Sequence, residues 1–200
     1  MSKRTKERQT RTSGCKFRVR EEGGEKRLEG YFSVFGDNYE LWPGATESVD
    51  PHAFDGALSD DIRVLIDHES RLVLGRTSAG TAALSVDDHG LFGSVLINND
   101  DQDALNLYAR VQRGDVSQAS FGFDILEEET DYREDGSIHW TIKKVKLYEV
   151  SVVTFPAYRD TEIDARKADF ADIKKRHLEV WKNERLNRLK KLEAKKKEGQ

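Results

Sequence analysis

Two hundred residues are enough for one domain with tails, or at most for two small domains. With 36% apolar and 35% charged residues, the chain can build a core but must keep a large part of itself in water. A lone cysteine, Cys15, excludes an internal disulfide and favours a reducing compartment. No apolar stretch approaches the ~18 residues of a membrane span, and the basic N-terminus lacks the apolar segment of a signal peptide. We therefore expect a soluble intracellular protein.

The net charge of −4 is unevenly distributed along the chain. Residues 1–28 carry ten basic and four acidic side chains, and residues 164–200 carry thirteen and seven. Residues 29–163 carry ten basic and 26 acidic side chains. An acidic body argues against a protein built to grip nucleic acid phosphates. The basic ends could bind an acidic surface, although charged termini are more often simply solvated.

The N-terminal quarter predicts a tail followed by a hairpin. Residues 1–14 are polar, basic and rich in threonine, so we expect them to be disordered. Residues 16–20 and 27–35 alternate in polarity as strands do, and residues 21–24 between them are typical of a turn. Residues 50–54 predict a short capped helix with proline in its first turn.

The middle of the chain predicts several short strands and one helix. Strand patterns cover residues 62–66, 72–77, 82–86 and 91–97. His68 lies two residues after the end of the first of these strands. A helix is predicted over residues 102–113, because it has an apolar stripe, capping side chains before it and Gly114 after it.

Two further strands follow the helix. Residues 117–126 carry Ser120, Asp135-Gly136 is a strong hairpin-turn signal, and residues 138–155 return. Many short strands with a single helix predict an α+β chain that is mainly β with helices. We expect these strands to form a closed or half-closed β-barrel.

The composition changes after Ala157. Residues 163–197 predict a long charged helix with a thin apolar stripe. It has too few apolar positions to fold alone, so it docks on a partner, pairs with a copy of itself or frays. We therefore divide the chain into a disordered basic tail (1–14), a β-barrel domain (15–160) and a charged helical tail (161–200).

Ser120 stands between small and aromatic neighbours. If Phe121 and Phe123 point into the core, Ser120 and Gly122 face the other way, towards solvent or a cleft. The absence of a side chain at Gly122 would let a substrate backbone approach closely. The stretch lacks the Gly-x-Ser-x-Gly elbow, and a serine on a strand is most often structural. Ser117 is the rival nucleophile.

Two other residues are candidates to act together with this serine. His68 would serve as a general base, although a satisfied histidine at a strand end is the commoner case. Glu149 is the only charge in residues 147–153, and a buried unpaired carboxylate is costly. Its partner is either His68 or an arginine or lysine across the sheet. Serine, histidine and carboxylate on three separate strands could form a hydrolytic triad, which is recognised by geometry rather than by chain order.

Metal sites are not favoured by the sequence. Residues 67–69 and 100–103 hold ligand-type side chains, but neither group has a zinc or EF-hand spacing. The carboxylates of the second group are better explained by the dipole of the helix that follows them. No glycine-rich loop that could cradle phosphates occurs. No metal or cofactor is therefore predicted.

Five segments, in order and with family-like spacing, resemble the prohead maturation proteases of tailed phages, serine peptidases that process capsid subunits during assembly. The resemblance extends from about residue 28 to residue 164. The segments are residues 30–35, residues 49–54, residues 66–68 with 74–76, residues 119–123 and residues 149–157. No one of them is decisive, but together they make a specific match.

The resemblance implies a fold similar to the herpesvirus assemblins, a β-barrel with helices around it. It implies a base at His68, a nucleophile at Ser120 and an orienting carboxylate at Glu149. The implied substrates are the scaffolding segment of the major capsid protein and the protease itself. The implied location is the host cytoplasm, inside the assembling prohead, and self-association is left open. Neither a membrane nor a specific nucleic acid is an expected partner.

Oxyanion donors are not marked by the sequence. Backbone N–H groups near Ser120 are the first candidates, and Arg76 is a weaker one. Phe121 and Gly122 are weak candidates for substrate contacts. Asp67 stands where the family usually has asparagine or a similar residue, so its role is open.

Two other functions remain compatible with the sequence. One is a non-catalytic scaffolding or adaptor protein that binds capsid subunits through the charged C-terminal helix. The other is a hydrolase that acts on another substrate with the same barrel.

Overall fold

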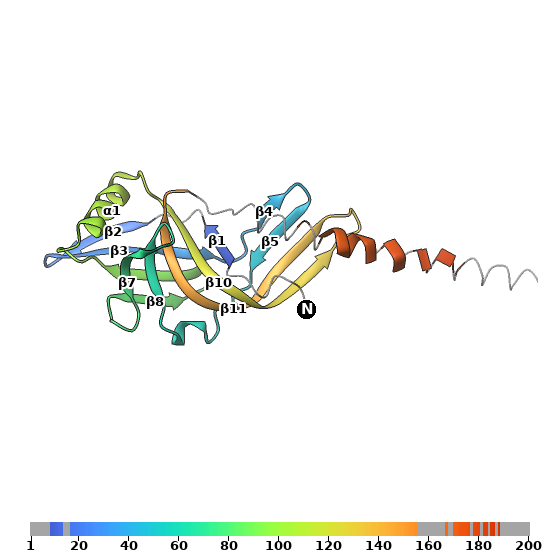
Figure 1. Ribbon diagram of the computed structural model, residues 1–200, viewed down its shortest axis with the longest axis horizontal. Coiled ribbons are helices and arrows are strands. Elements are labelled where there is room, and N and C mark those ends of the chain that lie inside the picture. Colours follow the sequence, from blue (N-terminus) through green and yellow to red (C-terminus); the bar gives the residue numbers. More distant parts are fainter. Residues whose placement is uncertain are drawn as a thin grey trace, which may run out of the picture. The chain divides into compact units, whose positions relative to one another are not determined.

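The computed structural model describes residues 9–13 and 17–155 and a discontinuous set near the C-terminus. That set comprises residues 167, 170–176, 178–180, 182, 183, 185, 186 and 188. The chain divides into two compact units, Met1–Arg159 and Asp160–Gln200. In the first unit, the described residues form two β-sheets, one α-helix and the short 3-10 helix η2 (Ala57–Ser59) (Figure 1). The prediction of a mainly β chain with few helices is confirmed.

The strands fall into a larger and a smaller sheet. The larger sheet contains β1 (Gln9–Ser13), β4 (Tyr39–Trp42), β5 (Ala45–Val49), β6 (Arg63–Ile66), β7 (Glu69–Arg76), β10 (Gln118–Tyr132) and β11 (Ile138–Val153). The smaller sheet contains β2 (Arg18–Glu22), β3 (Glu25–Val34), β9 (Gly90–Leu96) and β8 (Ala82–Val86), in that order. Neighbours in the smaller sheet are all antiparallel.

β11 explains the layout of the larger sheet, because it has different neighbours along its two sides. It pairs antiparallel with β10 on one side. On the other side its first part pairs parallel with β5, and its last part pairs parallel with β6. β1, β4 and β7 form edges that do not join. The sheets therefore do not close, and the predicted closed or half-closed β-barrel is wrong.

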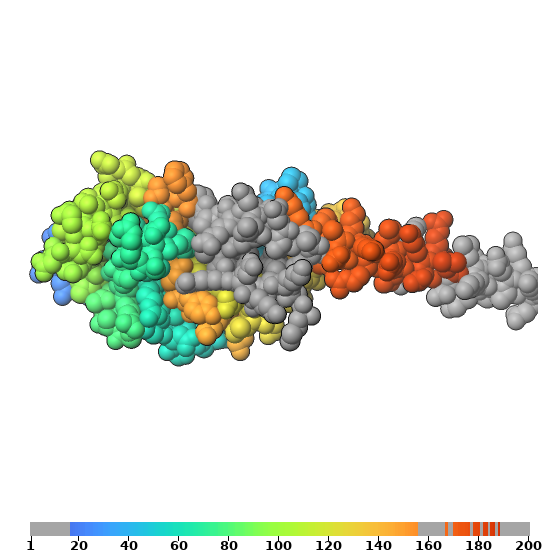
Figure 2. Space-filling model, viewed as in Figure 1, coloured from blue at the N-terminus to red at the C-terminus, as the bar shows by residue number. Residues whose placement is uncertain are grey.

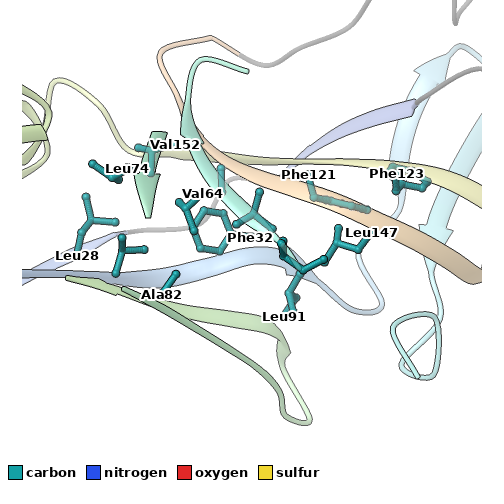
Figure 3. Close-up of a cluster of buried hydrophobic side chains, with 14 of the residues drawn as sticks. Leu28, Phe32, Val64, Leu74, Ala82, Leu91, Phe121, Phe123, Leu147 and Val152 are labelled. Carbon is teal, nitrogen blue, oxygen red and sulfur yellow. The ribbon is translucent and has the colours of Figure 1, made fainter. Parts of the chain in front are cut away.

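The core lies where the two sheets face each other. Leu28, Phe32 and Leu91 come from the smaller sheet, and Phe121 and Val152 come from the larger one (Figure 3). All five side chains are fully buried. This arrangement follows from the alternation of apolar and polar residues, which places every second side chain of a strand on the same face.

Helix α1 (Gln102–Arg113) has the bounds that the sequence predicts. The carboxylate of Asp101 accepts hydrogen bonds from the backbone N–H groups of Asp103 and Ala104, which satisfies donors that the first turn leaves free. Gly114 ends the helix with a φ of 87°, a left-handed conformation that glycine adopts without strain. The helix lies beside β2 at one end of the unit (Figures 1 and 2). The Asp101 carboxylate thus caps the helix, and Asp103 lies in its first turn.

The structure describes each end of the chain only in part, and at the N-terminal end the described part differs from the prediction. Gln9–Ser13, expected to be disordered, form β1, because the edge of β10 supplies hydrogen-bonding partners for their backbone. The rest of the 1–14 tail lies outside the described residues. In the predicted helical tail (161–200), residues 170–176 and 178–180 are helical. A long continuous helix is not shown, since much of that tail lies outside the described residues. Among the helices of the described ranges, none is long and apolar enough to span a membrane.

Candidate active site

Ser120 lies on β10, between β1 and β11. Its Cα is paired with Thr12 on one side and with Ser151 on the other. Because Phe121 packs in the core, Ser120 points to the opposite face of the sheet. The expectation that this serine faces solvent or a cleft is nevertheless wrong for this structure, because Ser120 is 0% exposed.

His68 is placed by the two-residue turn between β6 and β7. Both turn residues have positive φ angles, 49° at Asp67 and 61° at His68. Such a turn matches the twist of the paired strands, but its left-handed conformation favours glycine and asparagine. β6 runs parallel to β11, with Ile66 opposite Val152. The turn is thereby held at the end of β11.

Glu149 lies on β11 beside an irregularity in the ladder. Gly122 is paired with Glu149, but Phe123 is paired with Leu147, so Tyr148 is an extra residue on β11. A bulge of this kind bends a strand and changes the direction of nearby side chains. The side chain of Glu149 is only 3% exposed. This carboxylate therefore needs partners within the protein.

The three predicted residues meet in one hydrogen-bonded chain. Nδ1 of His68 lies 2.7 Å from Oε1 of Glu149, and Nε2 of His68 lies 2.8 Å from Oγ of Ser120. A carboxylate only accepts hydrogen bonds, so the Nδ1–H group of His68 donates to Glu149. Nε2 of the neutral ring then carries no proton and accepts a hydrogen bond from the hydroxyl of Ser120. This arrangement is able to activate a serine oxygen as a nucleophile.

The partner of Glu149 is thus a histidine. Arg63 is the basic residue opposite Glu149 in the β6–β11 register. Its guanidinium is directed to Asp61 instead, donating to the backbone carbonyl at 2.9 Å and approaching the carboxylate at 3.3 Å. Of the two partners that the sequence left open for Glu149, the structure places His68 there.

The weaker predictions have different outcomes. Arg76 binds Asp61, donating from Nε to both carboxylate oxygens at 2.9 Å. This hydrogen bond lowers the pKa of Asp61 well below its usual range and raises the pKa of Arg76. The side chain of Phe121 is buried in the core and stacks on Phe123, and its role as a substrate contact stays a prediction. Gly122 lies opposite Glu149, and its role as a substrate contact stays a prediction.

The rival serine and three other histidines lie in other surroundings. Ser117 is exposed just before β10 begins. His52 pairs with Asp55 at the surface, and His89 packs edge-on against Tyr31. His139 lies between the hydroxyl groups of Thr46 and Ser48, at 2.7 and 2.8 Å.

Ser151 is a site residue that the sequence analysis missed. It is fully buried, and its hydroxyl donates to Oε2 of Glu149 at 2.7 Å. Strand alternation already places residues 149 and 151 on one face, and this was the signal available in the sequence.

The chain matches one family model and is similar to two known proteins. A family model described as Caudovirus prohead serine protease matches residues 14–176. The prohead protease of Enterobacteria phage HK97 is 27% identical over 164 residues, which cover 80% of this chain and 68% of that protein. The solved structure of the bacteriophage T4 capsid assembly protease covers 73% of this chain and 96% of its own, with a TM-score of 0.46 and 10% identity. Since the family model matches most of the sequence, the chain belongs to the Caudovirus prohead serine proteases.

Proposed function

We propose that the protein is a serine endopeptidase that cleaves the scaffolding segment of the phage major capsid protein, and itself, during prohead maturation. Family membership supports a protease with a role in capsid maturation. The observation that carries the finer proposal is the chain of hydrogen bonds from Ser120 through His68 to Glu149. The substrate is proposed from what the family acts on, and the residues are proposed from this geometry.

In the proposed mechanism, Oγ of Ser120 attacks the scissile carbonyl while Nε2 of His68 takes the hydroxyl proton. The ring is then an imidazolium, and the carboxylate of Glu149 stabilises its charge and holds its orientation. When the tetrahedral intermediate collapses, His68 gives the proton to the leaving amine. Water, deprotonated by the same ring, then hydrolyses the acyl-enzyme and restores Ser120.

The oxyanion of the intermediate requires preorganised donors. Backbone N–H groups near Ser120 are the first choice, and because β10 is paired on both sides there, the donor must be an N–H group that the ladders leave free. Arg76 is the weaker choice, since its guanidinium is already engaged by Asp61. For Arg76 to serve, that ion pair must open.

We also propose that the tail of residues 161–200 docks the protease inside the assembling shell. The support is the change to a basic, sparsely apolar composition in this part of the chain. Deletion of residues 165–200 should leave peptide cleavage largely intact while reducing incorporation into proheads. Loss of peptide cleavage in the deletion variant would count against a separate docking role.

The proposed activity is tested by co-expression with the capsid protein, followed by intact-mass measurement of the products. Ser120→Ala should abolish processing, and Ser117→Ala should leave it unchanged. Equal processing by both variants would remove Ser120 as the nucleophile. Stoichiometric binding of intact capsid subunits, indifferent to Ser120→Ala, would indicate a scaffolding protein instead.

A further inference from the structure

The carboxylate of Glu149 has two oxygens, and the proposed mechanism uses only one. Oε1 accepts from Nδ1 of His68, while Oε2 accepts from the hydroxyl of Ser151 at 2.7 Å. Ser151 is fully buried, as expected for a group whose polar atom is satisfied inside the protein. A second donor thus holds the carboxylate from the side opposite the imidazole.

Ser151 also has a central place in the sheet. It is paired with Ser120 on β10 and with Leu65 on β6. β6 is the strand that leads into the turn carrying His68. One residue of β11 therefore lies beside the strand of the candidate nucleophile and beside the strand that delivers the candidate base. A displacement of Glu149 relative to either strand would have to move this residue too.

We propose that Ser151 is a positioning residue, which fixes the plane of the Glu149 carboxylate so that Oε1 stays directed at His68. This inference rests on the proposed function. A carboxylate bonded at one oxygen alone is able to rotate about its terminal torsion, which is broad and only roughly two-fold. A hydroxyl donor at the second oxygen removes that freedom, and it stabilises the charge through a charge-assisted hydrogen bond.

The charge on Glu149 makes this donor important. The basic residue opposite it in the register, Arg63, is engaged by Asp61. Asp124, on the neighbouring strand, accepts from the hydroxyl of Tyr148 at 2.6 Å. Within the part of the chain that the structure describes, the hydrogen bonds found at the carboxylate come from His68 and Ser151. Loss of Ser151 would leave Oε2 buried and unpaired, which favours a rotated carboxylate.

Ser33 provides a matched control. It is a fully buried serine on β3 in the smaller sheet, and its hydroxyl has no hydrogen-bond partner among the described residues. Ser33→Ala therefore removes the same atom from an equally buried position without touching the site. A role of Ser151 in packing alone would make the two alanine variants behave alike in catalysis.

The test measures peptide cleavage by Ser151→Ala, Ser151→Cys, Ser33→Ala and Ser120→Ala in the full chain. Ser151→Ala should lower kcat about tenfold or more with KM within about twofold, since a hydrogen bond to a charged group is lost. Ser151→Cys, which keeps a weak donor, should fall between Ala and the wild type. Ser33→Ala should cleave at the wild-type rate.

A second measurement follows the exchange of the His68 ring proton with water. In NMR spectra of histidine-labelled protein, the Nδ1 proton of His68 should exchange with water faster in Ser151→Ala than in Ser33→Ala. Wild-type kcat and unchanged exchange in folded Ser151→Ala and Ser151→Cys would overturn the positioning role and leave the proposed function standing. Cleavage by Ser120→Ala would instead overturn the proposed function and, with it, this inference.

Discussion

Asp67 holds Thr154 by two hydrogen bonds. Oδ1 of Asp67 accepts from the backbone N–H of Thr154 at 2.7 Å, and Oδ2 accepts from its hydroxyl at 3.1 Å. The backbone N–H of Asp67 in turn donates to the carbonyl of Val152 at 3.0 Å. These bonds fasten the turn that carries His68 to the end of β11, the strand that carries Glu149. The position before His68 therefore favours a short side chain with acceptor oxygens, because such a side chain is able to bind Thr154.

The first prediction concerns this attachment. Asp67→Ala should lower kcat by about tenfold or more, because it removes both bonds to Thr154 and places alanine at a φ of 49°, which costs roughly 1–2 kcal/mol. Asp67→Asn should retain most activity, since asparagine keeps an acceptor and tolerates that φ. Thr154→Val should have a small effect, because the backbone bond remains. Peptide-cleavage kinetics of the three variants provide the measurement, and equal rates for all three would contradict this role.

A second prediction isolates the strain at His68, whose φ is 61°. His68→Gly and His68→Ala both remove the imidazole and should both be inactive. His68→Gly should nevertheless be more stable than His68→Ala by about 1 kcal/mol, because only glycine adopts this φ without strain. At the exposed strand position Glu69 the order should reverse, since glycine is the weaker residue there. Chemical unfolding of the alanine and glycine variants at positions 68 and 69 measures both differences in stability. A His68→Ala variant more stable than His68→Gly would show that the turn is unstrained.

Glu149→Gln provides a third test. The amide resembles the carboxylate in shape, but its NH₂ group is able to donate to Nδ1 and stabilise the wrong ring tautomer. We expect kcat to fall by about 10³–10⁴-fold with little change in KM. Glu127→Gln, at an exposed position of β10, is the control and should match the wild type. A loss of less than tenfold in Glu149→Gln would mean that the carboxylate does not orient His68.

The fourth prediction concerns pH and a histidine outside the site. Burial lowers the pKa of His139 below 6.5, and nearby Arg133 lowers it further, although Asp131 opposes the shift. Because the folded-state pKa is depressed, the unfolded chain binds more protons below pH 6.5. The stability that His139 contributes is therefore present above pH 6.5 and is lost as the pH falls towards the folded-state value.

Thermal unfolding between pH 7.5 and 5 measures this effect. The unfolding midpoint of His139→Gln should depend less on pH over this range than that of the wild type. Parallel slopes for His139→Gln and the wild type would show that His139 does not destabilise the fold when it is protonated.

Local patterns predicted the elements of this fold better than their connections. The alternation around Phe121 and Phe123 identified the core face of β10, and capping residues gave both ends of α1. The closed barrel was wrong because alternation does not say which strands pair. The division of β11 between two parallel neighbours, β5 and β6, depends on contacts across most of the chain.

The same limit applies to the candidate site. Glu149 was recognisable from sequence, because a single carboxylate in an apolar β-branched stretch needs a partner. Ser151 was missed because a serine is unremarkable until the register places it beside that carboxylate. The engagement of Arg76 by Asp61 and the complete burial of Ser120 also depend on tertiary packing, which no local pattern contains.

The most direct test of Ser120 as the nucleophile is covalent labelling by a serine-directed phosphonate, with the modified residue located by peptide mass mapping. We predict a single label on Ser120 in the wild type and in Ser117→Ala, and no label in Ser120→Ala or His68→Gly. Labelling that persists in Ser120→Ala, or that maps to another serine, would contradict Ser120 as the nucleophile.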